Sequence, residues 1–256
     1  MNKIVENFFK RLAQTTSRRL FLDYDGTIAP FRQERDRAYP YDGIEQRLDR
    51  LIGLSKTIVT IVTGRAIKDI KPLLRLKKYP EIWGSHGWEY LDTADDYRIM
   101  ERSPEQLDDL QKAHQYILKH QLGQYLEEKP VSLAIHFRGV DPDKILEIRS
   151  KILYNWDSLV AGGNLIWDSF DGGMELKIPG FDKGNVVDRI LRNSPSKTVS
   201  AYLGDDLTDE DAFKALPSNG LGLLVRDKYR KTAAAAWIQP PHELYNFLDR
   251  WIEIDE

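Results

Sequence analysis

Short apolar segments alternate with longer amphipathic segments in the first third of the chain. The apolar segments cover residues 19–22, 57–62 and 81–83, and each is followed by a polar or glycine residue. The spacing of apolar positions predicts helices over about 43–54 and 66–76. Short apolar strands that alternate with helices are typical of a parallel sheet covered on both faces.

The last third of the chain returns to the same pattern. It predicts strands at 198–203 and 221–225, and helices at about 185–192, 209–215 and 242–254. A run of four alanines between the last strand and the last helix is also expected to be helical. We therefore expect the two ends of the chain to build one α/β core.

The middle of the chain begins with a long predicted helix over residues 103–121. Ser103 and Gln106 have the spacing of a capping box. Pro104 would occupy the first helical position, where a missing N–H does no harm. Both signals indicate where this helix begins.

The segment after this helix has a mixed pattern. Residues 131–138 alternate apolar and polar side chains in period two, as expected of a strand with one buried face. A helix is predicted over 142–154 and two further strands near 164–169 and 173–178. We interpret residues 102–178 as a second, α+β domain inserted into the α/β core.

Composition narrows the class of protein without identifying it. Of the 256 residues 41% are apolar and 30% charged, which is ordinary globular composition and excludes wholesale disorder. The net charge of −3 lacks a basic excess, so we expect no nucleic-acid partner. The absence of cysteine excludes disulfide, zinc–thiolate and iron–sulfur sites and permits a cytoplasmic location. No apolar run approaches the roughly 18 residues needed to span a bilayer, so we expect no membrane association.

Two carboxylates follow the first predicted strand, in the sequence Asp23-Tyr24-Asp25-Gly26-Thr27. Open parallel sheets bind ligands at the carboxyl ends of their strands, where two such side chains can face one small volume. Gly26 allows a sharp turn whose backbone N–H groups can hold an anion. A solvated Asx turn is the alternative explanation, because Asp and Gly are common in turns.

A second acidic segment follows the strand predicted at 198–203. Five of the seven residues from 205 to 211 are acidic, and they repel one another unless a cation neutralises them. Oxygen ligands without His or Cys suit Mg²⁺ rather than zinc. An acidic helix N-terminus is the alternative, because the helix dipole favours acids there. It accounts for the acids from Asp209 onward better than for Asp205 and Asp206, which precede the helix.

Two further positions could bind phosphate. Thr63 and Gly64 close the second strand and precede a helix, where a hydroxyl and free N–H groups can cradle a phosphate. The alternative for Thr63 is a helix N-cap. Lys183 lies at another predicted helix start, and a lone lysine there is most often solvated.

Together the four motifs resemble the haloacid dehalogenase (HAD) superfamily of phosphotransferases, because they occur in a fixed order at strand ends and helix starts. The resemblance implies a HAD-like catalytic core of residues 1–101 and 179–256 with a Rossmann-like, doubly wound parallel sheet. It also implies that the inserted α+β domain of residues 102–178 is a cap for sugar recognition.

Five segments give a narrower resemblance to the trehalose-6-phosphate phosphatases. They are residues 23–30, 62–65, 84–87, 134–138 and 204–213, and the match includes the cap. The first and last segments are the most specific. The chain departs from the family pattern in the larger residues just before the motif lysine and in the tryptophan after the Gly-x-His-Gly segment.

The resemblance implies a role for each motif residue. Asp23 would be the nucleophile and form an aspartyl-phosphate. Asp25 would protonate the leaving sugar oxygen and then activate water, so crowding by other acids should raise its pKa. Asp23, the main-chain oxygen of Asp25 and Asp205 would hold Mg²⁺. Asp206 and Asp209 would hold metal-bound waters. The groups expected to bind the phosphoryl oxygens are Gly26, Thr27, Thr63, Gly64 and Lys183, with Thr63 and Lys183 also catalytic.

The cap should select the sugar, because strand alternation places polar side chains on one face of its sheet. The residues expected to bind sugar hydroxyls are Lys129, His136, Arg138, Glu175 and Lys177. A sugar that lacks one of these hydroxyls would be rejected, since its partners would stay unpaired. The alternative is a polar face that contacts only solvent. His86 is expected to serve a structural loop rather than the chemistry.

The function implied by this resemblance is Mg²⁺-dependent hydrolysis of trehalose 6-phosphate to trehalose and phosphate, the last step of trehalose biosynthesis. Another sugar phosphatase, acting on sucrose phosphate, glycosyl-3-phosphoglycerate or hexose phosphate, is an open alternative. So is a non-catalytic regulatory module of a trehalose-phosphate synthase complex. We expect a cytoplasmic monomer that acts on a small sugar phosphate, and an association with trehalose-phosphate synthase is compatible with the resemblance.

Overall fold

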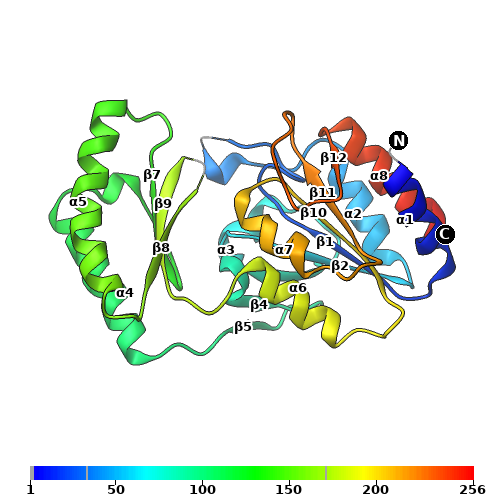
Figure 1. The fold of residues 1–256 in the computed structure, drawn as a ribbon, viewed down its shortest axis with the longest axis horizontal. Helices are drawn as coiled ribbons and strands as arrows, with labels where there is room; N and C mark the ends of the chain where they lie inside the picture. The colour runs from blue at the N-terminus through cyan, green and yellow to red at the C-terminus, as the bar shows by residue number, and fades with distance from the viewer. Residues whose placement is uncertain (1–2, 33, 171) are drawn as a thin grey trace. The chain divides into compact units, whose positions relative to one another are not determined.

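The computed structural model describes residues 3–32, 34–170 and 172–256 (Figure 1). The chain divides into two compact units. One runs from Met100 to Gly180, and the other combines the residues up to Ile99 with Phe181–Glu256. The limits of the contiguous unit lie two residues outside the expected 102–178 at each end. No helix among the described residues is long and apolar enough to cross a membrane.

The larger unit is built on an eight-stranded sheet. Its strands are β1 (Arg18–Leu22), β2 (Thr57–Val62), β3 (Glu81–Gly84), β4 (Glu89–Leu91), β5 (Tyr97–Ile99), β10 (Val199–Gly204), β11 (Leu221–Val225) and β12 (Ala236–Ile238). Their order is β12-β11-β10-β1-β2-β3-β4-β5. The strands from β12 to β3 pair in parallel, and β4 and β5 add an antiparallel edge. The parallel part has the strand order of a Rossmann-like fold, so the predicted fold class is confirmed.

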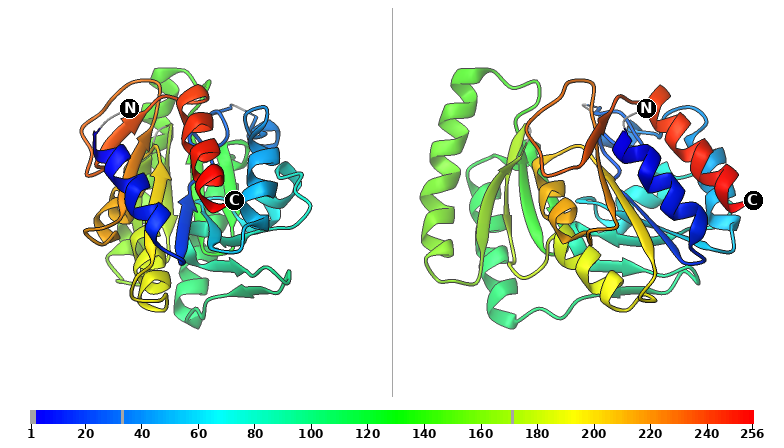
Figure 2. Two further views of the ribbon diagram at one scale, coloured as in Figure 1. Left: turned by 90° about the vertical axis from the view of Figure 1, so that its right-hand side faces the viewer. Right: turned by 45° about the vertical axis from the view of Figure 1, so that its right-hand side comes forward.

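Helices cover both faces of this sheet (Figure 2). They are α1 (Lys3–Gln14), α2 (Ile44–Gly53), α3 (Ile67–Ile70), α6 (Lys183–Arg192), α7 (Glu210–Ala215) and α8 (His242–Asp255). Leu20 of β1 and Trp251 of α8 belong to the core on one face. Phe21 points to the other face, where its ring stacks on Tyr202 and Tyr202 contacts Phe213 of α7. Burial on both faces explains why β1 ends in three consecutive apolar residues, Leu20, Phe21 and Leu22.

Two helix predictions are wrong. The helix expected over 66–76 ends at Ile70 and continues as a 3₁₀ turn, Lys71–Leu73, because Pro72 has no N–H to donate. The alanine run is not helical, since it leads into β12, where Ala236 pairs with β11.

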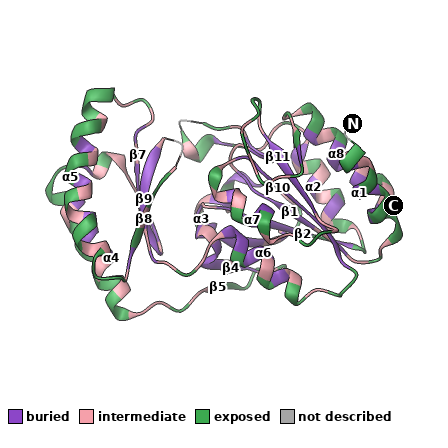
Figure 3. Ribbon diagram, viewed as in Figure 1, coloured by how far each residue is buried: buried purple, intermediate pink, exposed green. Residues whose placement is uncertain are grey.

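The smaller unit is a four-stranded antiparallel sheet with two helices. Its elements are α4 (Pro104–Lys119), β6 (Leu126–Lys129), β7 (Ser132–His136), α5 (Pro142–Val160), β8 (Ile166–Phe170) and β9 (Gly173–Lys177), with strand order β6-β7-β9-β8. The capping box predicted at the start of α4 is present. Leu133 pairs with Leu176 and Ile135 with Met174, which gives β7 and β9 one apolar face. Both strands are largely buried (Figure 3).

Candidate active site

Asp23 lies just beyond the carboxyl end of β1, where the strand order reverses between β1 and β10. Its N–H donates to the carbonyl oxygen of Leu203 at 2.9 Å, which fixes the main chain at this switch point. Gly26 has a φ of 80°, and a Cβ at this position would lie 2.3 Å from Oδ2 of Asp205. Both the backbone conformation and the close approach of the two motifs therefore require glycine.

The backbone N–H groups of Gly26 and Thr27, which are expected to bind phosphate, make hydrogen bonds within the turn. The N–H of Gly26 donates to Ala29 O at 2.7 Å, and the N–H of Thr27 donates to Tyr24 O at 3.3 Å. An anion would have to replace these two bonds. The Thr27 hydroxyl donates to Oδ2 of Asp23 at 3.4 Å.

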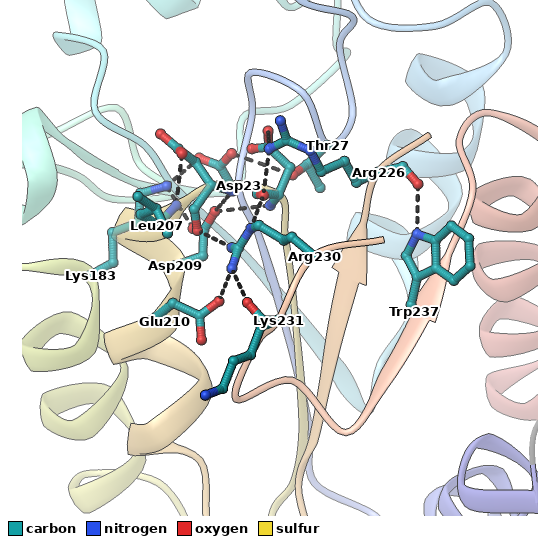
Figure 4. Close-up of polar contacts among 12 residues, drawn as sticks. Asp23, Thr27, Lys183, Leu207, Asp209, Glu210, Arg226, Arg230, Lys231 and Trp237 are labelled. Atoms are coloured by element: carbon teal, nitrogen blue, oxygen red, sulfur yellow. Dashed lines mark hydrogen bonds and ion pairs between the residues drawn. The ribbon is translucent and has the colours of Figure 1, made fainter. Parts of the chain in front are cut away.

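Lys183 is the first residue of α6, and its side chain is only 3% exposed. Its Nζ donates to Oδ1 of Asp23 and to Oδ1 of Asp209, both at 2.7 Å (Figure 4). The alternative of a solvated lysine is therefore wrong. Burial acts to lower the pKa of Lys183, but the charges and hydrogen bonds of Asp209 and Asp23 outweigh it and raise that pKa. Lys183 is thus a permanent cation beside Asp23.

Three buried carboxylates could hold a metal ion. Asp23, Asp205 and Asp209 each offer one oxygen, and these oxygens lie within 4.8 Å of one another. Neither carboxylate oxygen of Asp205 has a hydrogen-bond partner among the described residues. Burial, followed by the charges of Asp23 and Asp209, raises the pKa of Asp205 well above its ordinary value.

The donor set fits Mg²⁺. A buried, ionised carboxylate without hydrogen-bond partners destabilises the fold by roughly several kcal/mol unless a cation or a proton neutralises it. All the converging atoms are oxygens, which Mg²⁺ prefers. Burial also raises the pKa of Asp23 to about 7, although Lys183 acts to lower it.

Asp209 links the lysine to the acidic turn. Its Oδ1 accepts hydrogen bonds from Lys183 and from the Tyr202 hydroxyl, the latter at 2.6 Å. Its Oδ2 accepts from the N–H groups of Asp205 and Asp206, both at 2.9 Å. The carboxylate of Asp206 caps the following 3₁₀ turn. Asp209 therefore orders both the turn and Lys183.

Asp25 is paired with Arg65, a residue of the 62–65 motif to which the sequence interpretation assigned no role. Arg65 donates from Nε and Nη2 to the two carboxylate oxygens of Asp25, at 2.7 and 2.6 Å, and from Nη1 to Arg35 O at 2.8 Å. Burial acts to raise the pKa of Asp25, but the hydrogen bonds and charge of Arg65 outweigh it and hold that pKa below its ordinary value. The expectation that neighbouring acids raise the pKa of Asp25 is wrong for this structure.

Thr63 and Gly64 lie beside these groups at the end of β2. The Thr63 hydroxyl accepts a hydrogen bond from the N–H of Arg65 at 3.1 Å, and the side chain does not cap α3. A Cβ on Gly64 would lie 2.7 Å from Cε1 of His86, whose own φ of 58° is left-handed. His86 thus packs directly on the predicted phosphate-binding turn.

Comparison with known proteins assigns the chain to a protein family. A sequence profile described as trehalose-phosphatase matches residues 21–236. The chain belongs to the trehalose-phosphatase family. The identification as a trehalose-phosphatase, made above from its motifs, is therefore confirmed.

Individual relatives agree with this assignment. This trehalose-phosphatase is 28% identical to probable trehalose-phosphate phosphatase J of Arabidopsis thaliana, over 96% of the chain and 71% of the relative. Its fold is similar to the C-terminal domain of a C. albicans trehalose-6-phosphate phosphatase, with a TM-score of 0.81 at 22% identity over 97% of this chain and 96% of the other. It is also similar to the C-terminal domain of a Candida albicans trehalose synthase regulatory protein, with a TM-score of 0.66 at 13% identity over 95% and 97%.

In the smaller unit of this trehalose-phosphatase, most polar residues predicted to bind sugar pair with one another or with neighbours. Lys129 donates to Oε1 of Glu175 at 2.8 Å, and Ser132 donates to the same oxygen at 2.6 Å. His136 pairs with Glu127 at 2.8 Å, Lys177 pairs with Asp168 at 2.8 Å, and the Arg138 side chain packs against Gly172. The register places Lys129, Ser132 and Lys177 in line across three strands.

Sequence reasoning missed two residues that order the catalytic groups. Arg65 immediately follows Thr63 and Gly64, so its position in the motif was a usable signal. Tyr202 is 0% exposed inside an apolar strand, where its hydroxyl could only be expected to find some partner. Nothing in the local pattern identified that partner as Asp209.

Proposed function

We propose that the protein hydrolyses trehalose 6-phosphate to trehalose and phosphate with Mg²⁺ as cofactor. The observation that carries this proposal is the buried cluster of Asp23, Asp205, Asp209 and Lys183 at the switch point of the sheet. Neither oxygen of Asp205 has a hydrogen-bond partner among the described residues, and the carboxylate forms a long ion pair with Arg226, whose Nη1 lies 4.0 Å from Oδ2. Oδ1 of Asp23 already accepts a hydrogen bond from Lys183. Membership of the trehalose-phosphatase family supplies the substrate class.

Asp23 is the proposed nucleophile. Its Oδ1 accepts a hydrogen bond from Lys183 at 2.7 Å, and its Oδ2 accepts a longer one from Thr27 at 3.4 Å. Oδ2, the more weakly held oxygen, would attack phosphorus while the bond from phosphorus to the sugar oxygen breaks. The product of this step is an aspartyl-phosphate. Asp23, Asp205 and the main-chain oxygen of Asp25 would hold Mg²⁺, with Asp206 and Asp209 supporting its waters. When bound, the ion offsets the repulsion between the carboxylate and the phosphate.

Asp25 is the proposed acid and base. It would donate a proton to the leaving sugar oxygen and then take one from the water that cleaves the aspartyl-phosphate. Because Arg65 now occupies both of its oxygens, Asp25 must give up at least one of these bonds before it can act. Thr63, Gly64 and Lys183 would bind the phosphoryl oxygens, and Gly26 and Thr27 would join them once their turn bonds are exchanged.

The polar face of the smaller sheet is the proposed source of sugar contacts. Lys129, His136, Arg138, Glu175 and Lys177 would exchange their present partners for hydroxyl groups. Most of these side chains now pair with a charged side chain, and each would leave its pair to bind a sugar hydroxyl. A sugar that lacked that hydroxyl would leave the side chain without a partner and would therefore bind less tightly.

Phosphate release from purified protein tests the proposal. Trehalose 6-phosphate, sucrose phosphate, glycosyl-3-phosphoglycerate and a hexose phosphate are compared at equal concentrations with Mg²⁺, and Asp23→Asn is the matched control. We expect a preference for trehalose 6-phosphate and no turnover by Asp23→Asn. Equal rates on all four substrates would remove the specific assignment. Failure to release phosphate from any of them would favour a regulatory module, for which binding to trehalose-phosphate synthase is then measured.

A further inference from the structure

The acidic turn after β10, residues 205–209, also contacts the loop between β11 and β12. Arg230 donates from Nη2 to Asp206 O at 2.7 Å and from Nε to Asp205 O at 3.3 Å. Arg226 donates to the same Asp205 oxygen at 3.3 Å. In Figure 4 the guanidinium group of Arg230 lies between the acidic turn and Glu210.

Arg230 is itself fixed in place. Its Nη1 donates to the Glu210 carboxylate and, at 3.0 Å, to Lys231 O. The same carboxylate accepts from the Thr232 hydroxyl at 2.8 Å and from the N–H of Ala233 at 2.6 Å. Three hydrogen bonds to the carboxylate of Glu210, the first residue of α7, therefore anchor this arginine and its loop.

These contacts complete the main-chain hydrogen bonding of two consecutive residues. The N–H groups of Asp205 and Asp206 both bond to Asp209, and their carbonyl oxygens bond to Arg230. Buried backbone groups are costly when unpaired, so a turn satisfied on both sides has little freedom to rotate. The carboxylate of Asp205, which accepts no hydrogen bond from the described residues, therefore extends from a main chain with one strongly preferred conformation.

We propose that Arg230 is a positioning residue that sets the affinity of the site for Mg²⁺ by holding the main chain of Asp205 and Asp206. This inference rests on the proposed function only for the presence of the metal ion. Groups that orient metal ligands without touching the metal typically change affinity by about 10–100-fold when removed. The positive charge of Arg230 opposes cation binding, but that charge is paired with the Glu210 carboxylate and the side chain is 19% exposed, so we expect the ordering effect to dominate.

Calorimetric titration with Mg²⁺ alone, without substrate, tests this inference on the full chain. The variants are Arg230→Ala, Arg230→Lys, Asp205→Asn and the control Lys228→Ala, which removes a positive charge from an exposed position of the same loop. We expect Arg230→Ala to weaken Mg²⁺ binding by about tenfold or more and Arg230→Lys to weaken it less. Lys228→Ala should change the affinity for Mg²⁺ by less than about twofold, because the charge of an exposed side chain is screened by the surrounding salt solution.

Steady-state kinetics separate positioning from a general loss of structure. At saturating Mg²⁺ the kcat of Arg230→Ala should return to within about threefold of the parent, whereas the half-saturating Mg²⁺ concentration should rise with the Kd. A kcat that stays low at every Mg²⁺ concentration would overturn the inference. If Arg230→Ala does not fold, Arg230→Lys decides the question by the same two measurements.

The outcomes distinguish this inference from the function on which it rests. If the parent protein binds Mg²⁺, Asp205→Asn does not, and Arg230→Ala binds as well as the parent, the proposed metal site stands and the role of Arg230 is wrong. Tighter binding by Arg230→Ala would mean that charge repulsion dominates, and would also overturn it. If the parent protein does not bind Mg²⁺, the metal-dependent function fails, and the inference fails with it.

Discussion

Removing Mg²⁺ should make the stability of the protein fall as the pH rises. Without a metal ion, burial raises the pKa of Asp23 from its ordinary 3.8 to about 7. Between these values the folded protein holds a proton that the unfolded chain has lost. Because the folded state binds more protons, its free energy of unfolding decreases with pH across this window.

The size of this effect follows from the shift. About three pH units at roughly 1.4 kcal/mol each give a loss of up to about 4 kcal/mol between pH 4 and pH 7. Mg²⁺ binds the ionised carboxylates, so a saturating concentration should restore most of this loss near neutral pH. Urea unfolding measured from pH 4 to pH 7 gives the free energy of unfolding as a function of pH, once in a chelator and once in saturating Mg²⁺.

Asp205→Asn provides the matched control for this prediction. It removes the Asp205 carboxyl, whose own pKa is raised by burial and by the charge of Asp23, while keeping the size of the side chain, so its stability in chelator should fall less steeply with pH. Near neutral pH and without Mg²⁺, the Asp205→Asn variant should be more stable than the parent protein. A parent protein whose stability, relative to Asp205→Asn, stays constant or rises from pH 4 to pH 7 would refute the reasoning.

Three further substitutions probe separate contacts. Gly26→Ala would force a left-handed φ of 80° on alanine and place its Cβ 2.3 Å from Asp205 Oδ2. We therefore expect urea unfolding to show a loss of at least about 2 kcal/mol in stability, and phosphatase activity to be lost. Parent-like stability and activity would contradict this. Arg65→Leu leaves the partly buried Asp25 without its ion-pair partner and should lower the free energy of unfolding by about 2 kcal/mol. Urea unfolding at pH 7 measures this, and an unchanged midpoint would show that the ion pair contributes little to stability. Glu175→Gln removes the charge that pairs with Lys129 and should raise KM for trehalose 6-phosphate about tenfold, whereas an unchanged KM would exclude Glu175 from sugar binding.

The parts of the structure that were predictable are those whose physical cause lies in the local sequence. Apolar runs that end in Asp23 and Asp205 identified neighbouring strands of a parallel sheet, and their carboxyl ends meet because the sheet is Rossmann-like. The capping box at Ser103 placed the start of α4 for the same reason, since all its partners lie within one turn.

The parts that were not predictable depend on residues far apart in the sequence. The pKa of Asp25 depends on Arg65, forty positions away, and an estimate from nearby acids gave the wrong direction. The alanine run has high helix propensity, yet pairing with β11 outweighs it. Tyr202 could be recognised as a core residue, but its partner Asp209 is set by the three-dimensional path of the acidic turn.

The position of β1 between β2 and β10 affects how the molecule can be made. During synthesis, β2 is the next strand after β1, but the strand on the other edge of β1 pairs with it at positions 181 residues later, as Arg18 does with Val199, after the whole of the smaller unit. That contiguous unit can collapse on its own core while β1 still presents an open edge. A nascent chain therefore has no assembled nucleophile, lysine and acidic turn until it has been extended past Asp209.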